Sequence, residues 1–172
     1  MYITRKIETT LKRISQTFPV LMVTGPRQSG KTTLLNHLRE EGRKYVSLDD
    51  PSDRLYAKTE PSAFLERYSP PVVIDEVQYA PELFPYIKIH VDRYKTNGGF
   101  WLTGLQMFHM MKNVSESLAS RVGKLLLLFN RKILPRIFSV ELQRHFIKCP
   151  SRFSSSLSIL VLTDSTYIAL PR

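Results

Sequence analysis

One stretch of eight residues limits the folds open to this chain more than any other feature. The short apolar run Val20–Thr24 leads into it, and a segment with Leu34, Leu35 and Leu38 follows it. The run is too brief for a helix and suits a buried parallel strand, whereas the leucine spacing is typical of a helix. We therefore expect the chain to turn sharply from a buried strand into a helix between Gly25 and Thr32.

This stretch matches the phosphate-binding pattern G-x-x-x-x-G-K-[ST] at every fixed position. Its two glycines allow a tight turn that points successive backbone N–H groups at a phosphate. We expect Lys31 to bridge the β- and γ-phosphate oxygens, Thr32 to coordinate Mg²⁺ through its hydroxyl, and Thr33 to reach the α-phosphate. The predicted nucleotide site comprises Gly25, Pro26, Arg27, Gln28, Ser29, Gly30, Lys31, Thr32 and Thr33.

Two acidic residues end the most strand-like segment of the chain, Val72–Glu76. An acid at that point lies at the carboxyl edge of a sheet, where open α/β folds bind their ligands. We predict that Asp75 is the second magnesium ligand and that Glu76 polarises the attacking water. A base separate from the metal ligand favours hydrolysis over simple nucleotide holding. The alternative is an ordinary acidic pair on the surface.

Gln106 and Arg121 are further candidates for catalysis. Gln106 follows the strand-like segment Phe100–Gly104 and could reach the γ-phosphate or the water, or it could only cap a helix. Arg121 could act as an arginine finger on a neighbouring subunit, which would require a homo-oligomer, or it could be a solvated arginine at a helix end. The sequence leaves these alternatives open.

Strand-like and helical segments alternate along the chain. The expected strands are Val20–Thr24, Tyr45–Leu48, Val72–Glu76, Phe100–Gly104 and Lys124–Phe129. The expected helices are 3–18, 31–42, Ala63–Arg67, Phe84–Tyr94 and Ser115–Arg121. This order predicts an α/β fold over residues 1–128, a three-layer αβα sandwich around a mostly parallel, five-stranded sheet.

Residues 129–172 are patterned more weakly. Pro135 could begin an amphipathic helix, and five of the eight residues from Ser151 to Ser158 are serine, as in a linker. Ile159–Leu162 and Tyr167–Leu170 could be strands, but the sequence does not fix their partners. We expect a basic, serine-rich and poorly defined tail.

Charge and composition add weaker constraints. The net charge is +10, and seven basic against two acidic residues from Leu125 to Arg172 supply half of it. A nucleic-acid partner and a solvated basic surface explain this equally well.

No apolar run approaches the roughly 18 residues that cross a bilayer. Cys149 is the single cysteine, and the first residues lack the features of a secretory signal. We expect a cytoplasmic protein without a membrane partner.

These motifs, in this order, resemble the AAA-type P-loop ATPase domain of bacteria and archaea. The resemblance covers residues 1–128 through Gly25–Thr33, Tyr45–Asp50, Val73–Pro81, Leu102–Gly104 and Ser115–Arg121. It implies ATP rather than GTP, and it implies that the Phe100–Gly104 strand lies between the two strands that carry the motifs. Such domains are usually followed by a C-terminal domain that is sometimes likened to a nuclease fold.

The chain departs from this family at Leu105, since the usual pattern after Leu102-Thr103-Gly104 is Ser-Gln. The hydroxyl that would sense the phosphate is absent there. The likeness ends near residue 128, which suggests a truncated or frame-shifted member. The leading prediction is Mg²⁺-dependent ATP hydrolysis. The alternatives are a nucleotide-binding module that no longer hydrolyses, a small-molecule kinase, and a DNA-associated motor or sensor.

Overall fold

The structure is a computed structural model, and it describes residues 7–105, 118, 120–127, 159–163 and 166–169. Its helices are α1 (Ile7–Thr17), α2 (Lys31–Leu38), α3 (Pro51–Thr59), α4 (Pro61–Arg67), the 3₁₀ turn η1 (Val77–Tyr79) and α5 (Leu83–Tyr94). Its strands are β1 (Val20–Thr24), β2 (Lys44–Ser47), β3 (Val72–Asp75), β4 (Phe100–Gly104), β5 (Val122–Leu127), β6 (Ile159–Thr163) and β7 (Thr166–Ala169).

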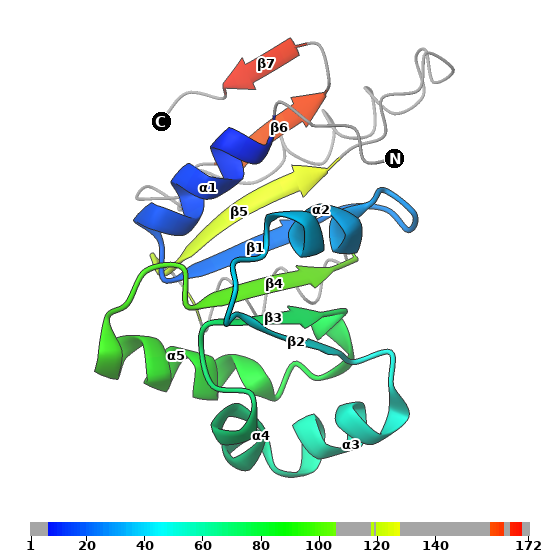
Figure 1. The fold of residues 1–172 in the computed structure, drawn as a ribbon, viewed down its shortest axis with the longest axis vertical. Helices are drawn as coiled ribbons and strands as arrows, with labels where there is room; N and C mark the ends of the chain where they lie inside the picture. Colours follow the sequence, from blue (N-terminus) through cyan, green and yellow to red (C-terminus); the bar gives the residue numbers. More distant parts are fainter. Residues whose placement is uncertain (1–6, 106–117, 119, 128–158, 164–165, 170–172) are drawn as a thin grey trace, which may run out of the picture.

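All described strands join one sheet in the order β2-β3-β4-β1-β5-β6-β7 (Figure 1). Strands β1 to β5 pair in parallel, which confirms the predicted α/β class with a five-stranded parallel sheet. Strand β4 lies between β3 and β1, as the resemblance implied. The carboxyl ends of β1, β3 and β4 therefore meet at one edge of the sheet.

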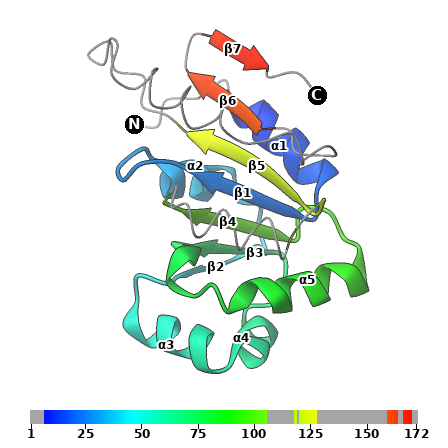
Figure 2. The same ribbon diagram turned by 180° about the vertical axis from the view of Figure 1, so that it is seen from behind.

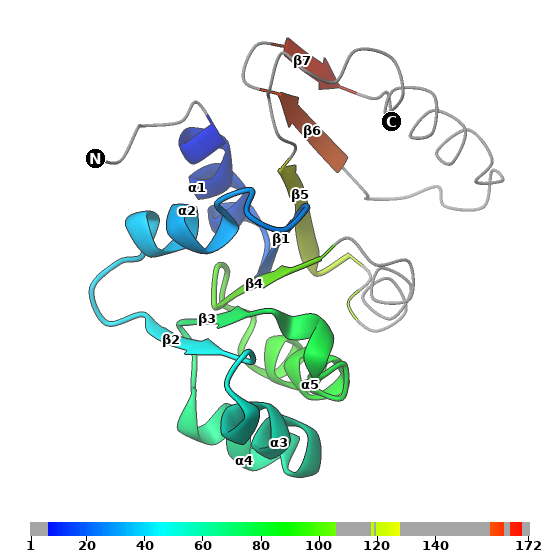
Figure 3. The same ribbon diagram turned by 90° about the vertical axis from the view of Figure 1, so that its right-hand side faces the viewer.

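Helices cover both faces of this sheet. Figure 3 shows α1 and α2 on one side and α3, α4 and α5 on the other, and Figure 2 shows α5 from the second side. Leu21, Val23 and Trp101 belong to the core under α1 and α2. Met22, Ile74 and Leu102 belong to the core under the other three helices. Because neighbouring residues of a strand point to opposite faces, the central strands must be apolar throughout, as the sequence has them.

Helix α3 was absent from the elements predicted from the sequence. Asp50 caps it, because its Oδ1 accepts hydrogen bonds from the backbone N–H groups of Ser52 (2.8 Å) and Asp53 (3.2 Å). Pro51 occupies the first turn of α3, where the backbone N–H that proline lacks would have no partner within the helix. An aspartate followed by proline is a signal for a helix start, and Asp50-Pro51 follows the expected strand Tyr45–Leu48.

Strands β6 and β7 fall in the segment expected to be a tail. The sequence left their partners open, and the structure pairs β6 in parallel with β5 and β7 antiparallel with β6. Several predictions fall outside the described residues. These are the helix that could begin at Pro135, the candidate Gln106, and most of the helix expected over Ser115–Arg121. None of the helices in the described part of the chain is long and apolar enough to cross a membrane.

Candidate functional site

The loop from Gly25 to Gly30 joins the end of β1 to the start of α2. A Cβ atom on Gly25 would lie 2.4 Å from the carbonyl oxygen of Leu127, so β5 leaves no room for a side chain there. Gly30 precedes α2 with φ 77°, in the left-handed region that glycine adopts without strain. Both glycines are thus required by the path of the backbone. That path aims the N-terminus of α2, with its exposed N–H groups, at the end of the sheet.

The Lys31 ammonium folds back over this loop. It donates hydrogen bonds to the carbonyl oxygens of Gly25 (3.0 Å) and Pro26 (2.9 Å), and the residue is only 5% exposed. Burial lowers the pKa of Lys31, while the charges of Glu76 and Asp75 act to raise it. An ammonium has three donors. The two described bonds therefore leave one donor that an anionic oxygen in the adjacent pocket can take.

Three hydroxyl groups converge on the Asp75 carboxylate. Thr32 Oγ1 donates to Asp75 Oδ2 at 2.8 Å, and the Tyr45 phenol donates to the same oxygen at 3.0 Å. Thr103 Oγ1 donates to the other oxygen, Oδ1. These residues come from α2, β2 and β4, whereas Asp75 ends β3. The fold thus brings three residues from separate elements to the carboxylate of a fourth, Asp75.

The Tyr45 phenol is a hydrogen-bond donor over the whole physiological pH range. Burial and the neighbouring Asp75 charge raise its pKa to about 12, so the hydroxyl keeps its proton. Asp75 is only 4% exposed, and its carboxylate is in hydrogen-bond contact with Thr32, which lines the pocket. The site therefore presents to its pocket a threonine oxygen whose proton is already directed at a buried acid.

Glu76 lies one residue beyond β3 in an unusual backbone conformation. Its φ of 57° is in the left-handed region, which a non-glycine residue adopts at an energetic cost. Its backbone N–H donates to Thr103 Oγ1 at 3.1 Å, which helps to hold that conformation. The turn directs the Glu76 side chain into the pocket, while Asp75 stays buried beside it.

The Glu76 carboxylate is held by Gln78. The amide nitrogen of Gln78 donates to Glu76 Oε2, and its amide oxygen accepts the backbone N–H of Leu105 at 3.3 Å. Gln78 is therefore a bridge between the acid and the residue that follows β4. It uses the backbone of Leu105, so the bridge does not depend on which side chain stands at that position.

A pocket of about 440 Å³ opens at this edge of the sheet. It is lined by Arg27, Gln28, Gly30, Lys31, Thr32, Thr33, Asp49, Glu76 and Tyr79. The Tyr79 ring is fixed by the Arg54 guanidinium, which stacks on it at 4.0 Å and also donates to the Leu48 carbonyl at 2.8 Å. The volume lies within the usual range for small-molecule sites, and the walls combine cationic, hydroxyl and carboxylate groups.

The donor set at Thr32 and Asp75 fits a hard divalent cation. Both groups offer oxygen, the ligand that Mg²⁺ prefers, and they are in hydrogen-bond contact. Within the described residues, no three His, Cys, Asp or Glu side chains gather in a way that could hold a metal alone. Two protein oxygens are enough for Mg²⁺, which commonly uses one or two and takes its other ligands from phosphates and water.

Of the residues singled out from the sequence, the structure brings Lys31, Thr32, Asp75 and Glu76 together. Gln106 lies outside the described residues. Arg121 lies elsewhere, because its carbonyl oxygen accepts the N–H of Val20 at the start of β1, five strand residues from the loop. At ~3.3 Å per strand residue, the start of β1 lies about 16 Å from the loop. The Arg121 guanidinium instead forms a bidentate ion pair with the Asp92 carboxylate of α5.

Sequence reasoning missed Tyr45 and Gln78 as parts of this site. Both lie in segments that carry the family resemblance, Tyr45–Asp50 and Val73–Pro81, but neither residue type at its position indicated a role in the site. Gln78 comes three residues after the acid that ends β3, and Tyr45 lies on the neighbouring strand, and neither position gives a periodic signal. Their roles become visible only once strand register is known.

Comparisons with known proteins agree with this geometry. A family model described as an AAA domain matches residues 17–130. Over 113 residues the chain is 34% identical to the uncharacterized protein Rv2008c of Mycobacterium tuberculosis and, equally, to the uncharacterized protein Mb2031c of Mycobacterium bovis. The matched stretch is 65% of this chain but only 25% of each relative, so the chain spans about a quarter of their length.

Proposed function

The chain belongs to the AAA domain family, a family of ATPase-like nucleotide-binding domains, and we propose that it binds ATP with Mg²⁺ and hydrolyses it. The observation that carries the proposal is the contact between Thr32 and Asp75 at 2.8 Å, beside the buried ammonium of Lys31. A motif threonine, a strand-ending acid and a lysine would meet in this way if the site holds a triphosphate with its metal.

The loop would bind the phosphates through backbone N–H groups at the start of α2, and Lys31 would neutralise the β- and γ-phosphate oxygens. Magnesium, when bound, would supply positive charge to the same oxygens. Thr32, through its hydroxyl oxygen, and Asp75 would be the residues that hold it, and Asp75 Oδ2 also accepts the hydrogen bond of the Thr32 hydroxyl. The attacking water would be oriented by other side chains of the site.

Glu76 is the base in this proposal. Its carboxylate would take a proton from the attacking water as the water oxygen bonds to the γ-phosphorus, and the bond from that phosphorus to the β,γ-bridging oxygen breaks. Gln78 holds the carboxylate at the pocket wall, so the base is fixed before substrate arrives. Positioned bases of this kind contribute roughly 10²–10⁴ in rate.

One observation favours the second candidate, a module that binds nucleotide without turnover. Leu105 stands after β4, where the resemblance leads us to expect a serine hydroxyl. The Gln78 bridge reaches the Leu105 backbone and therefore does not supply that missing side-chain donor. If the hydroxyl is needed for catalysis, binding would survive while hydrolysis fails.

An arginine finger from a neighbouring copy remains part of the proposal, with Arg121 as its source. Arg121 would have to leave Asp92 to reach another subunit's phosphates. This predicts that turnover per chain rises with protein concentration as a homo-oligomer forms. A polyanionic partner is a separate proposal that only the charge of +10 supports, and a cytoplasmic location is a proposal that only the single cysteine supports.

Steady-state phosphate release tests the proposal directly. The protein with ATP and Mg²⁺ should release phosphate above background, and Lys31→Ala should lower that release at least about 10²-fold, because it removes charge aimed at the reacting phosphate. Repeating the assay with DNA and at several protein concentrations tests the two partner proposals. Tight ATP binding without release would support the second candidate. Release above background that is the same in Lys31→Ala would contradict the assignment of hydrolysis to this site.

A further inference from the structure

Tyr45 reaches the predicted metal site from the neighbouring edge strand. In the pairing of β2 with β3, Ser47 lies opposite Asp75 and Tyr45 lies opposite Val73. Tyr45 is thus two residues before the position facing Asp75, on the same face of the sheet. A diagonal neighbour of this kind is within reach of a long aromatic side chain. The phenol spans the diagonal and donates to Asp75 Oδ2 at 3.0 Å.

The hydrogen bonds on Asp75 restrict how this acid can act. A carboxylate offers about four lone-pair positions, two on each oxygen. Thr32 and Tyr45 occupy both positions on Oδ2, and Thr103 occupies one on Oδ1. The carboxylate cannot rotate without breaking at least one of these bonds. Its orientation is therefore fixed from three sides.

We propose that Tyr45 is a positioning residue for the divalent cation, which it serves by locking the Asp75 carboxylate that orients the Thr32 hydroxyl. The inference rests on the proposed function. With Asp75 held, the Thr32 O–H bond points at Oδ2, and the lone pairs of Thr32 Oγ1 face the pocket. Without the phenol, Oδ2 gains an open position, the carboxylate can turn, and the Thr32 oxygen loses its fixed direction.

The hydroxyl of Tyr45 can be separated from its ring. The ring packs against the core formed by α1 and α2 and is partly buried. Tyr45→Phe keeps this packing and removes only the donor, so the variant should fold as the natural chain does. Tyr86→Phe is the matched control, because Tyr86 is an exposed tyrosine of α5. Helix α5 lies on the opposite side of the sheet from α1 and α2, whose core Tyr45 packs against.

The test compares ADP binding with saturating Mg²⁺ and with chelator, by calorimetry, in the natural chain and both variants. The ratio of the two dissociation constants measures how strongly metal and nucleotide favour each other. Groups that orient a metal ligand usually contribute 10–100-fold to metal affinity. We expect Tyr45→Phe to reduce the ratio about 10-fold. Its affinity for ADP in chelator should match that of the natural chain, and Tyr86→Phe should match in both arms.

Two results would overturn the inference. One is an unchanged ratio in Tyr45→Phe, and the other is an equal loss of affinity in both arms, which would indicate a general structural role. Failure of the proposed function would look different, since the natural chain itself would then bind no ADP in either arm.

Discussion

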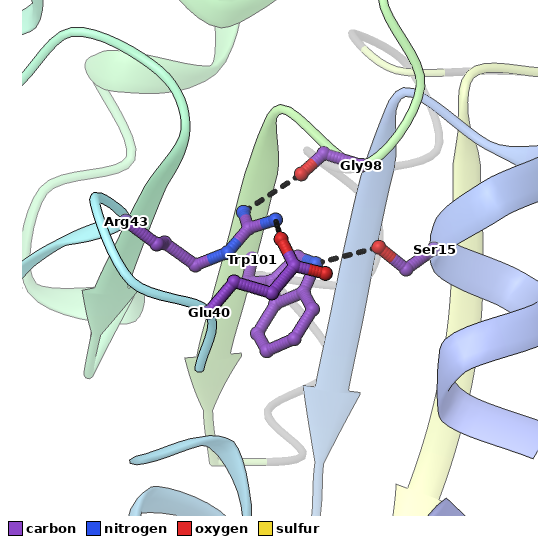
Figure 4. Close-up of polar contacts among 5 residues, drawn as sticks. All are labelled: Ser15, Glu40, Arg43, Gly98 and Trp101. Carbon is purple, nitrogen blue, oxygen red and sulfur yellow. Dashed lines mark hydrogen bonds and ion pairs between the residues drawn. The ribbon is translucent and has the colours of Figure 1, made fainter. Parts of the chain in front are cut away.

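The two ends of the central sheet both bury polar groups, but they use them in opposite ways. At the carboxyl end, three hydroxyls meet the Asp75 carboxylate beside an open pocket. At the amino end, the Arg43 guanidinium stacks on the Trp101 ring at 4.1 Å and donates to the Gly98 carbonyl at 2.8 Å (Figure 4). Trp101 in turn donates to Ser15 Oγ at 2.8 Å.

The partners explain the difference. Arg43 is 7% exposed, and its described partners are a backbone carbonyl, an aromatic face and Glu40 at 3.3 Å. Burial lowers the pKa of its guanidinium, and the charge of Glu40 opposes this effect. These contacts tie the segments before β2 and β4 to α1. The amino end therefore stabilises the fold, whereas the carboxyl end keeps charged groups beside a space where a ligand can complete their contacts.

Removing the base at the carboxyl end should have the largest effect. Glu76→Gln keeps the shape of the side chain but cannot accept a proton from water. We expect phosphate release to fall about 10²–10⁴-fold, while ATP affinity and the melting temperature stay close to those of the natural chain. Single-turnover phosphate release and calorimetric ATP binding measure the two quantities. A parallel loss of affinity would show that Glu76 belongs to binding rather than to catalysis.

Removing the guanidinium at the amino end should do the reverse. Arg43→Ala leaves the Gly98 carbonyl without its charged donor and removes the stacking on Trp101. We expect the free energy of unfolding to fall by about 3 kcal/mol, from the lost charged hydrogen bond and cation–π contact. Urea unfolding measures this change. ATP affinity of the folded protein should not change, and a weaker affinity would mean that the two ends are coupled.

Loosening the base without removing it should have a smaller effect. Gln78→Leu breaks the bridge between Glu76 and the Leu105 backbone but leaves every atom of the loop in place. A hydrogen bond to a charged group contributes ~1.5–3 kcal/mol, so we expect release to slow by about 10- to 150-fold. The dependence of ADP binding on Mg²⁺ should be unchanged, in contrast to Tyr45→Phe. A change in that dependence would contradict the separate roles assigned to Gln78 and Tyr45.

The smallest expected change is again at the amino end. Trp101→Phe keeps an aromatic face for Arg43 but loses the donor to Ser15 Oγ. We expect a loss of about 1–2 kcal/mol in the free energy of unfolding, from one hydrogen bond and some buried area. Thermal unfolding of this variant and Arg43→Ala in the same buffer would rank them. A larger loss for Trp101→Phe would place the ring, and not the guanidinium, at the centre of this cluster.

The sequence predicted the parallel core and the turn from β1 into α2 well, because their signals are local. Val20–Thr24 and Phe100–Gly104 are strands with the predicted bounds, since continuous apolar runs next to turn residues have few other uses. Helix α3 was missed because its core contribution is small, with Ala57 as its buried residue. An apolar stripe was too short there to reveal a helix, and only the cap at Asp50 marked it.

The contacts within the site were harder to predict, for a physical reason. Whether Tyr45 reaches Asp75 depends on the register of β2 against β3, and a shift by one residue would turn its side chain to the other face. Register follows from packing of the whole sheet and not from either strand alone. Arg121 illustrates the same limit, since its pairing with Asp92 depends on where α5 ends relative to β5.

The most direct test of the central claim is the stabilisation of the fold by Mg-ATP, measured by urea unfolding. At about 100 times the dissociation constant, a ligand that binds only the folded state adds ~2.7 kcal/mol to the free energy of unfolding. We expect this gain in the natural chain and, on a lower baseline, in Arg43→Ala, and we expect it to disappear in Lys31→Ala at the same ATP concentration. The same gain in Lys31→Ala, or none in the natural chain, would contradict the assignment of the carboxyl edge as the nucleotide site.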